Sequence, residues 1–466
     1  DCGLQGEFPM GIFQLPNLRF LSIRYNPYLT GYLPEFQSGN QLESLLLAGT
    51  NFSGQLPGSL GNLKSLKEFD AARCYFSGVI PSSLGNLTKL NYLHLSDNRF
   101  SGKIPSTFVN LLQLTDLSLS SNNFRSGTLD WLGNLTNLNY VDLQDTSSYG
   151  NIPSFLRNLT QLTVLALQGN KLTGQIPSWI GNHTQLISLY LGVNKLHGPI
   201  PESISRLQNL EELDLGNNFF SGEFPSFLRD QNHLELLFFF DNELVGHIPK
   251  WFMNMTIYEY NVSNNKLNGE IPEVICNLTL LSVVDLSNNN LSGQLPPCLG
   301  IKSSTASVLD LRNNSFRGEI PDTFTSGCSL RIVDFGQNKL EGKIPKSLAN
   351  CTKLEILNLE QNKINCVFPS WLGVLPHLRV MILRSNALHG MIRKPETNVE
   401  FPRLQIVDLS NNSFKGKLPL EYFRNWTAMQ NVHNENLIYM QAHISFQTSH
   451  HVMEYWYEYS MTMTNK

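Results

Sequence analysis

The chain has 466 residues, with 34 basic against 38 acidic side chains, so its formal net charge is −4 at pH 7. This near balance, without a run or stripe of basic residues, argues against a nucleic-acid-binding protein. No apolar stretch approaches the roughly 20 residues of a membrane-spanning helix, and the N-terminus carries no signal-like segment. A chain of this length would ordinarily suggest about three domains.

An internal repeat overrides that expectation, because each unit of a repeat array contacts only its neighbours. Its clearest copy, LSVVDLSNNNLSGQLP, runs from Leu281 to Pro296. There Val284 and Leu286 alternate as in a short strand with one buried face, and Asn289 can satisfy backbone groups where the chain leaves the strand. The Asn289 position, called the ladder position below, returns every 24 residues, with steps of 23, 25 and 26 at three places. Its occupants are Asn26, Thr50, Cys74, Asn98, Asn122, Thr146, Asn170, Asn194, Asn218, Asn242, Asn265, Asn289, Asn314, Asn338, Asn362, Asn386 and Asn412.

Most repeats continue with G-x-I/L/F-P and then L/F-x-N-L, as in SGKIPSTFVNLLQ from Ser101. This phrase predicts a second short extended piece and then a helical or 3₁₀ turn on the convex side, with proline before its first turn. The repeat from Leu114 lacks that proline, so we expect its outer face to differ. The predicted fold is α/β, a leucine-rich-repeat solenoid that coils as a right-handed superhelix and lines its concave side with a parallel sheet.

The repeats extend nearly to both ends of the chain. Cys2 occupies the ladder position of a rung that the chain enters halfway, and 17 rungs follow from Leu18. A solenoid needs polar caps over its open ends, and none precedes Asp1 or follows Lys466. We therefore expect a fragment of a longer extracellular protein; a complete protein with an unusual cap is the alternative.

Cysteine placement indicates an oxidising compartment. Cys276 and Cys298 lie at nearly matching positions of consecutive rungs, and Cys328 and Cys351 repeat this arrangement further along. Neighbouring strands stack about 4.7–4.9 Å apart, which is compatible with two disulfides and a secreted protein. Cys2 and Cys74 are interpreted as buried ladder residues, Cys366 has no evident partner, and no Cys or His cluster has the spacing of a metal site.

Glycosylation sequons also indicate a secreted protein, although part of their density follows from the repeated GNLT phrase. Several are expected where a rung turns onto the outer face. We expect N-linked glycans and no other cofactor. The sequons are at Asn51, Asn86, Asn134, Asn158, Asn182, Asn254, Asn261, Asn277, Asn290, Asn313, Asn350, Asn411 and Asn425.

The residues between the strand leucines should line the concave sheet, which is the usual binding surface of such solenoids. From Asp285 onward the middle exposed position is mostly Asp or Asn and the preceding one Val or Ile, so we interpret that half as consensus scaffold. The earlier half collects aromatic residues, which are favoured interface anchors; the alternative is that they pack on one another. The candidate concave ligand-binding residues are Tyr92, His94, Tyr140, Tyr190, Phe238 and Phe240.

Asn261 adds a constraint on that surface, since it occupies the middle exposed position of its rung and begins a sequon. A glycan there would exclude protein ligands and confine the footprint to the rungs before Ile257, or move it to the C-terminal tail. An unused sequon, or a glycan bent aside, is the alternative.

No catalytic constellation emerges. Aspartates recur because the strand phrase recurs, so their environments are expected to be equivalent. Acid–base chemistry requires a pair of carboxyl groups in different environments. No nucleophile elbow or triad context accompanies the Ser and His residues. We therefore predict that the chain is not an enzyme and binds no metal.

The phrase LxxLxLxxNxLxGxIPxxLGNL resembles the plant-specific class of extracellular leucine-rich repeats, over about Cys2 to Trp426. Receptor kinases, receptor-like proteins and polygalacturonase-inhibiting proteins share this phrase. The ladder stops near Asn431, and YFRNWTAM, from Tyr422 to Met429, is similar to the phrase that precedes the island segment of plant receptor-like proteins. The resemblance implies a repeat array at 1–430 and a truncated island at 431–466.

The island offers a second candidate surface. Its candidate ligand-binding residues are Tyr455, Trp456, Tyr457 and Tyr459. The adjacent His450 and His451 lack a third ligand for a metal, so we interpret them as part of a solvated loop whose partial charge at mildly acidic pH would modulate binding.

The resemblance implies an immune receptor ectodomain in the apoplast, sensing a secreted microbial protein such as a glycoside hydrolase. It also implies a receptor-kinase co-receptor that contacts repeats beyond the island, and a plasma-membrane anchor further along the full-length protein. Two alternatives stay open: a soluble inhibitor of a secreted glycosidase, and a hormone or peptide receptor whose island forms a small-molecule groove.

Overall fold

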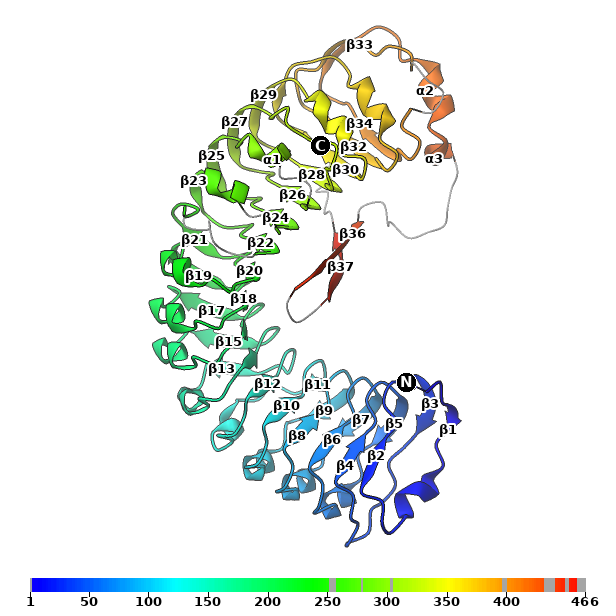
Figure 1. Ribbon diagram of the computed structural model, residues 1–466, viewed down its shortest axis with the longest axis vertical. Coiled ribbons are helices and arrows are strands. Elements are labelled where there is room, and N and C mark those ends of the chain that lie inside the picture. Colours follow the sequence, from blue (N-terminus) through cyan, green and yellow to red (C-terminus); the bar gives the residue numbers. More distant parts are fainter. Residues whose placement is uncertain are drawn as a thin grey trace. The chain divides into compact units, whose positions relative to one another are not determined.

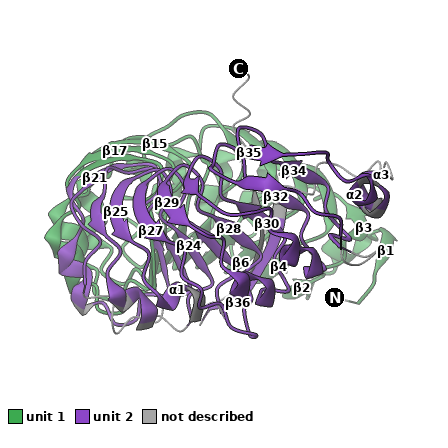
Figure 2. Cartoon of the chain, turned by 90° about the horizontal axis from the view of Figure 1, so that it is seen from above, with its two compact units in different colours: residues 1–221 green, residues 222–466 purple. Residues whose placement is uncertain are grey.

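The computed structural model describes residues 2–250, 257–277, 280–301, 305–395, 400–430, 441–448 and 452–458. The chain divides into two compact units, unit 1 at Asp1–Ser221 and unit 2 at Gly222–Lys466 (Figure 2). Both consist of stacked rungs with the repeating order strand, lateral strand and short helix (Figure 1). The predicted leucine-rich-repeat fold is confirmed.

In unit 1 the concave strands have three residues each and pair in parallel. Their middle residues face the core, and Leu93, for example, is buried opposite Leu117 of the next strand. These strands are β2 (Phe20–Ser22), β4 (Ser44–Leu46), β6 (Glu68–Asp70), β8 (Tyr92–His94), β10 (Asp116–Ser118), β12 (Tyr140–Asp142), β14 (Val164–Ala166), β16 (Ser188–Tyr190) and β18 (Glu212–Asp214).

The G-x-I-P phrase forms the lateral strands, and proline precedes most of the convex 3₁₀ helices, as at Pro105. One lateral sheet of unit 1 contains β1 (Gln5–Glu7), β3 (Tyr28–Gly31), β5 (Asn51–Gln55), β7 (Tyr75–Val79), β9 (Arg99–Gly102) and β11 (Asn123–Phe124). A new sheet begins with β13 (Tyr149–Asn151), β15 (Lys171–Gly174), β17 (Lys195–Gly198) and β19 (Phe219–Glu223). The convex helices are η1 (Met10–Gln14), η2 (Gly58–Asn62), η3 (Ser82–Asn86), η4 (Ser106–Asn110), η5 (Asp130–Leu132), η6 (Ser154–Asn158), η7 (Ser178–Asn182) and η8 (Glu202–Arg206).

Unit 2 repeats this plan. Its concave strands are β20 (Leu236–Phe238), β22 (Glu259–Asn261), β24 (Val283–Asp285), β26 (Val308–Asp310), β28 (Ile332–Asp334), β30 (Ile356–Asn358), β32 (Val380–Ile382) and β34 (Ile406–Asp408). Its lateral strands are β21 (Glu243–Val245), β23 (Asn268–Glu270), β25 (Asn290–Gln294), β27 (Ser315–Glu319), β29 (Lys339–Gly342), β31 (Lys363–Ile364), β33 (His389–Met391) and β35 (Ser413–Lys415). Its helices are η9 (Ser226–Asp230), η11 (Glu273–Asn277), α1 (Cys298–Ile301), η12 (Lys346–Asn350), η13 (Ser370–Val374), α2 (Leu420–Asn425) and α3 (Thr427–Gln430). None of the helices in the described parts of the chain is long and apolar enough to cross a membrane.

The ladder asparagines connect each rung to its neighbours. Nδ2 of Asn122 donates to the carbonyl oxygens of Leu95, Leu119 and Ser120, each at 3.0 Å. Its Oδ1 accepts from the backbone amide of Phe100 in the preceding rung, also at 3.0 Å. One amide side chain therefore satisfies four buried backbone groups that the turn would otherwise leave unpaired.

The ladder residues that are not asparagine make some of the same hydrogen bonds or occupy the same position. Thr50 and Thr146 donate to backbone carbonyls three residues earlier, at 2.7 and 2.8 Å. Cys74 is buried, as predicted, and its thiol donates to the carbonyl of Leu47 at 3.4 Å. The prediction for Cys2 is wrong: its side chain is exposed, because it lies in the first described turn, with a neighbouring rung on one side only.

Both predicted disulfides form. Cys276 joins Cys298 with their Cα atoms 5.6 Å apart, and Cys328 joins Cys351 at 4.7 Å. Cys366 is free and buried.

The tail departs from the rung plan, since β36 (Gln441–Gln447) and β37 (Val452–Glu458) form an antiparallel hairpin. Ala442 and Ile444 of β36 are fully buried, and Phe446 packs beside them against the concave sheet of unit 2. Nη1 of Arg331 donates to the carbonyl of His443 at 2.6 Å. The hydrophobic strip beneath the hairpin consists of Val283, Val308, Ile332, Ile356, Val380, Ile382 and Ile406.

This strip corrects the interpretation of the later rungs as plain scaffold. The Val and Ile side chains occupy exposed positions of the repeat, yet most are fully buried. They are apolar because they bind the hairpin, which the repeat pattern alone does not reveal.

We predict that Asn122→Ala lowers the stability of unit 1 by about 1–3 kcal/mol, because buried backbone groups lose their partner. The measurement is the urea-denaturation midpoint. Asn123→Ala is the matched control, since Asn123 is the next residue and is exposed. Equal midpoints for the two variants would show that the ladder amide is dispensable.

Candidate functional site

The geometry of a rung directs two side chains of each concave strand to the concave face. In β8, Leu93 points into the core and is fully buried, whereas Tyr92 and His94 on either side are half-buried on the concave face. The same alternation presents Tyr140 from β12 and Tyr190 from β16. The structure therefore places the four predicted residues of unit 1 on the concave face.

Three of them form one cluster, which also contains Arg24 and Asp70. The rings of Tyr92 and His94 stack with centroids 4.0 Å apart, and Oη of Tyr92 lies 2.8 Å from Nδ1 of His94. His94 is 5.7 Å from the Tyr140 ring. The Arg24 guanidinium lies 6.0 Å from the Tyr92 ring centroid, and its Nη2 is 2.6 Å from Oδ2 of Asp70. We call these five residues the unit 1 patch.

Burial sets the protonation states of the unit 1 patch. Burial, reinforced by the nearby Arg24 charge, lowers the pKa of His94 to about 4, so its imidazole is neutral at mildly acidic pH. Burial raises the pKa of Tyr92 and of Tyr140 to about 12, which keeps both phenols protonated. Burial also raises the pKa of Asp70, against the opposing effects of the Ala72 amide and Arg24. The patch therefore presents largely neutral aromatic rings with hydrogen-bonding groups, the composition typical of interface anchors.

Sequence reasoning missed Arg24 and Asp70. Arg24 occupies the position two residues before the ladder Asn26, whereas the candidate set was drawn from aromatic residues. The repeat pattern shows which aromatic side chains face the concave surface. It does not show which charged side chain of another rung extends far enough to contact them. Here Arg24 spans from the rung of β2 to Asp70 in β6, two rungs further along.

Tyr190 lies outside the unit 1 patch, two rungs beyond Tyr140. It is in register with Asp214 of β18. Burial raises the pKa of Asp214 to about 6, although the Gly216 amide opposes this shift. A partly protonated carboxyl group beside a tyrosine therefore forms a separate polar feature of this face.

In unit 2, Phe238 and Phe240 are half-buried and contact each other edge to face, with ring centroids 6.4 Å apart and planes at 69°. This mutual packing is the alternative considered for the aromatic residues. It reduces the apolar surface that they offer to a partner.

The candidate residues of the island are described only in part. Tyr455, Trp456 and Tyr457 have their backbone in β37, in register with β36, and their side chains lie outside the description. Tyr459, His450 and His451 lie outside the described residues altogether. Under β36, Ala442 and Ile444 fill the space against the hydrophobic strip, which argues against a small-molecule groove at these residues.

The sequons lie mostly on the outer surface. Asn86, Asn158, Asn182 and Asn350 are exposed at the last residue of a convex 3₁₀ helix. Further exposed sequons are at Asn134, Asn290, Asn313 and Asn411, whereas Asn51 is half-buried. Asn277 and Asn425 end η11 and α2 with side chains outside the description, and Asn254 lies outside the described residues.

Asn261 lies on the concave face, as predicted, at the end of β22. It is half-buried, and its Oδ1 accepts from the amide and the hydroxyl of Ser263 at 3.1 and 2.7 Å. Whether a glycan is attached there stays a prediction.

The aspartates of unit 2 serve the fold. Oδ1 of Asp310 accepts from the Arg312 amide at 3.0 Å, and Asp285 and Asp334 accept the equivalent amides of their own turns. Burial, reinforced by the charges of Asp285 and Asp334, raises the pKa of Asp310 well above its usual range. Among the described residues no group of three or more His, Cys, Asp or Glu could hold a metal ion.

Comparison with known families identifies the repeats. Two models, both described as leucine-rich repeat, match the chain. One matches residues 160–220 and 304–364; the other matches 41–63, 65–87, 89–111, 113–135, 261–278, 280–300 and 403–426.

Among curated proteins, the chain is 60% identical over 183 residues to Receptor-like protein 7 of Arabidopsis thaliana. That alignment covers 38% of this chain and 18% of the relative. The alignments to Receptor-like proteins 53, 32 and 35 from Arabidopsis thaliana also span about a fifth of the length of those relatives.

Solved structures extend the similarity over most of the chain. A crystal structure of PEPR1–AtPEP1 superposes with a TM-score of 0.80 at 32% identity, covering 91% of this chain and 63% of that one. The Arabidopsis receptor kinase HAESA, in complex with the peptide hormone IDA and the co-receptor SERK1, gives a TM-score of 0.77 at 29% identity, covering 91% and 79%.

We predict that His94 contributes to the pH dependence of stability. Its pKa is about 4 in the folded chain and about 6.5 when unfolded, so between these values the unfolded state binds more protons. The contribution of His94 to stability should therefore be lost as pH drops from about 6.5 to about 4, so over this range the denaturation midpoint of His94→Gln should decline less, relative to its value at neutral pH, than that of the parent. Asp214, whose pKa burial raises to about 6, contributes in the opposite direction in both proteins. His197→Gln, at an exposed site, is the control; an unchanged slope in His94→Gln would contradict the prediction. His183, whose pKa burial also lowers, contributes in the same direction as His94 in both proteins.

We predict that Ile444→Asp releases the hairpin from unit 2, because burying an unpaired carboxylate costs about 3 kcal/mol or more. Limited proteolysis with mass spectrometry should then show faster cleavage beside β36. Gln447→Asp introduces the same charge at an exposed position of the same strand and should leave the rate unchanged. Equal rates for both variants would argue against docking through the hydrophobic strip.

Proposed function

Because this chain belongs to the leucine-rich-repeat receptor-like proteins of plants, a family of extracellular receptors rather than enzymes, we propose that it recognises a secreted ligand through the concave face of unit 1. The unit 1 patch is the observation that carries this proposal. It gathers two tyrosines, a neutral histidine and an Arg–Asp pair within contact distance on a face that the repeat leaves open. Tyrosine and arginine are enriched among the residues that dominate binding energy at protein interfaces.

The hairpin supports this assignment by its position within unit 2. The concave strands from β24 to β32 bury their apolar side chains beneath β36. That part of the sheet therefore already has an occupant. In unit 1, Tyr92, His94 and Tyr140 are half-buried within their own face and keep part of their surface exposed.

The ligand we propose is a protein or peptide, because several anchors spread over adjacent rungs suit an extended contact rather than a small molecule. Solved relatives support a peptide ligand and a co-receptor as kinds of partner: HAESA is seen with the peptide hormone IDA and the co-receptor SERK1. The resemblance to receptor-like proteins supports a finer proposal, a secreted microbial glycoside hydrolase sensed in innate immunity. We also propose that a receptor kinase acts as co-receptor and that the full-length protein is anchored in the plasma membrane. Both roles would depend on segments that are not part of this sequence.

The test captures secreted microbial proteins with the glycosylated chain and identifies them by mass spectrometry. The captured protein is then purified and its affinity measured for the parent and for Tyr92→Ala/Tyr140→Ala. Loss of both anchors should weaken binding by about 500-fold or more, since each hot-spot side chain contributes about 2 kcal/mol, or about thirtyfold. An assay for glycoside hydrolase activity of the captured protein checks the finer proposal separately.

Two controls localise the contact. Tyr75→Ala removes an exposed tyrosine from the lateral strand β7 of the same unit and should leave affinity unchanged. Phe238→Ala/Phe240→Ala tests the aromatic pair of unit 2. Equal affinity of the parent and the Tyr92/Tyr140 variant would exclude the unit 1 patch, and failure to capture any protein would contradict the proposed function.

A further inference from the structure

A break in the lateral sheet of unit 1 opens a pocket that the concave site does not use. Lateral strands β5, β7 and β9 have four or five residues, whereas β11 has two and η5 has three. The sheet that begins at β1 ends at β11, and the next one starts at β13. This is the repeat from Leu114 that lacks proline, so the prediction of a different outer face is confirmed.

The local sequence explains the break. In the preceding rung, Gly102 adopts a positive φ of 76° at the end of β9, and Pro105 then starts η4. In this rung Ser126 stands at the glycine position and Leu129 at the proline position. A serine disfavours the left-handed conformation, so the chain leaves the sheet early and rejoins only through an isolated bridge between Gly127 and Ser148.

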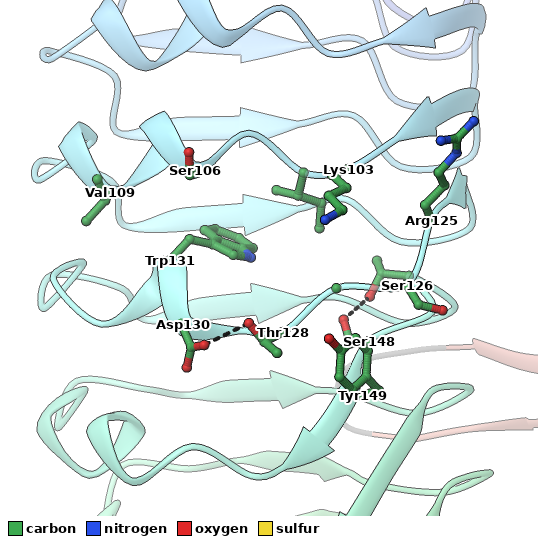
Figure 3. A pocket seen from close by; sticks show the side chains of 13 residues that line it. Lys103, Ser106, Val109, Arg125, Ser126, Thr128, Asp130, Trp131, Ser148 and Tyr149 are labelled. Carbon is green, nitrogen blue, oxygen red and sulfur yellow. Dashed lines mark hydrogen bonds between the residues drawn. The ribbon is translucent and has the colours of Figure 1, made fainter.

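The pocket that results has a volume of about 450 Å³. Figure 3 shows Lys103 and the Trp131 ring inside the hollow, with Tyr149 and Arg125 at its edges. Trp131 is half-buried and contacts Phe108 edge to face at 5.8 Å, so its position is fixed by the core. The lining also contains the hydroxyl groups of Ser106, Thr128 and Ser148.

The charges of the lining indicate an acidic ligand. Lys103 and Arg125 are both exposed and, within the described parts of the chain, neither makes an ion pair. A third cation lies close by, because Nζ of Lys171 donates to Oγ of Ser126 at 3.3 Å. Unpaired cations beside hydroxyl groups favour a carboxylate or another oxyanion.

Asp130 narrows the class of ligand. Its carboxylate accepts from Oγ1 of Thr128 at 2.8 Å and remains exposed, so it can accept further hydrogen bonds but would repel a free phosphate or sulfate. A ligand that fits must therefore offer hydroxyl donors as well as negative charge. The two aromatic side chains, Trp131 and Tyr149, provide flat apolar faces beside these polar groups.

We propose that this lateral pocket binds an acidic oligosaccharide, whose uronic acid carboxylate pairs with Lys103 and Arg125 while a sugar hydroxyl donates to Asp130. The sugar ring packs against Trp131, which anchors it next to the charged groups. This site is independent of the concave surface and of the protein ligand proposed there.

The test titrates the full glycosylated chain with a short oligomer of galacturonic acid by isothermal titration calorimetry, and in parallel with a neutral glucose oligomer and with inorganic phosphate. The acidic oligomer should bind, and the other two should not. Lys103→Ala and Trp131→Ala should each weaken binding about tenfold. Lys89→Ala is the matched control, since it removes an exposed lysine outside the pocket and should leave affinity unchanged.

Trp131→Phe keeps an aromatic ring against Phe108 and should retain much of the binding, which separates loss of the ligand contact from misfolding. Binding of the acidic oligomer that is weakened equally by Lys89→Ala would reveal non-specific charge attraction and overturn the proposal. Equal binding of the neutral oligomer or of phosphate, or no binding of the acidic oligomer, would overturn it as well.

Discussion

The structure depends on how each rung satisfies the backbone where it leaves the concave strand. A ladder asparagine donates to three carbonyl groups and accepts one amide, as Asn122 does. The residue before it adopts a positive φ, even where it is Val193, at 53°. This strained conformation persists because the amide network and the core around it leave no better arrangement. Repetition of this one turn stacks the strands in register and gives each rung the same two positions on the concave face.

Those positions then serve different purposes along the chain. In unit 2 they carry the Val and Ile residues of the hydrophobic strip, which binds the hairpin. The hydrogen bond from Arg331 to the carbonyl of His443 adds to this contact. In unit 1 they carry Tyr92, His94, Tyr140 and Asp70 of the unit 1 patch, and Arg24 reaches this group from beyond the end of β2. A repeat scaffold can therefore specialise without changing its backbone, because only the residues that face outward differ from rung to rung.

Burial on the concave face also determines charge. His94 is neutral and Tyr92 and Tyr140 are protonated over the mildly acidic range because their neighbours exclude water. The lateral pocket differs, since Lys103 and Arg125 are exposed and line it. The two surfaces of unit 1 thus differ in chemistry: one suits an aromatic protein contact, and the other suits an acidic sugar.

The amino-acid sequence by itself determined the period, the ladder, the strand faces, the two disulfides and the positions of the concave aromatic residues, because each follows from spacing within or between adjacent rungs. The tertiary structure alone decided which residues from distant rungs meet. Arg24 reaches Asp70 and Tyr92 across rungs, and β36 reaches strands more than a hundred residues earlier. It also decided that Phe238 and Phe240 pack on each other and that a missing proline and a displaced glycine open a pocket. These outcomes depend on side-chain reach and on competing contacts, which a repeat pattern does not encode.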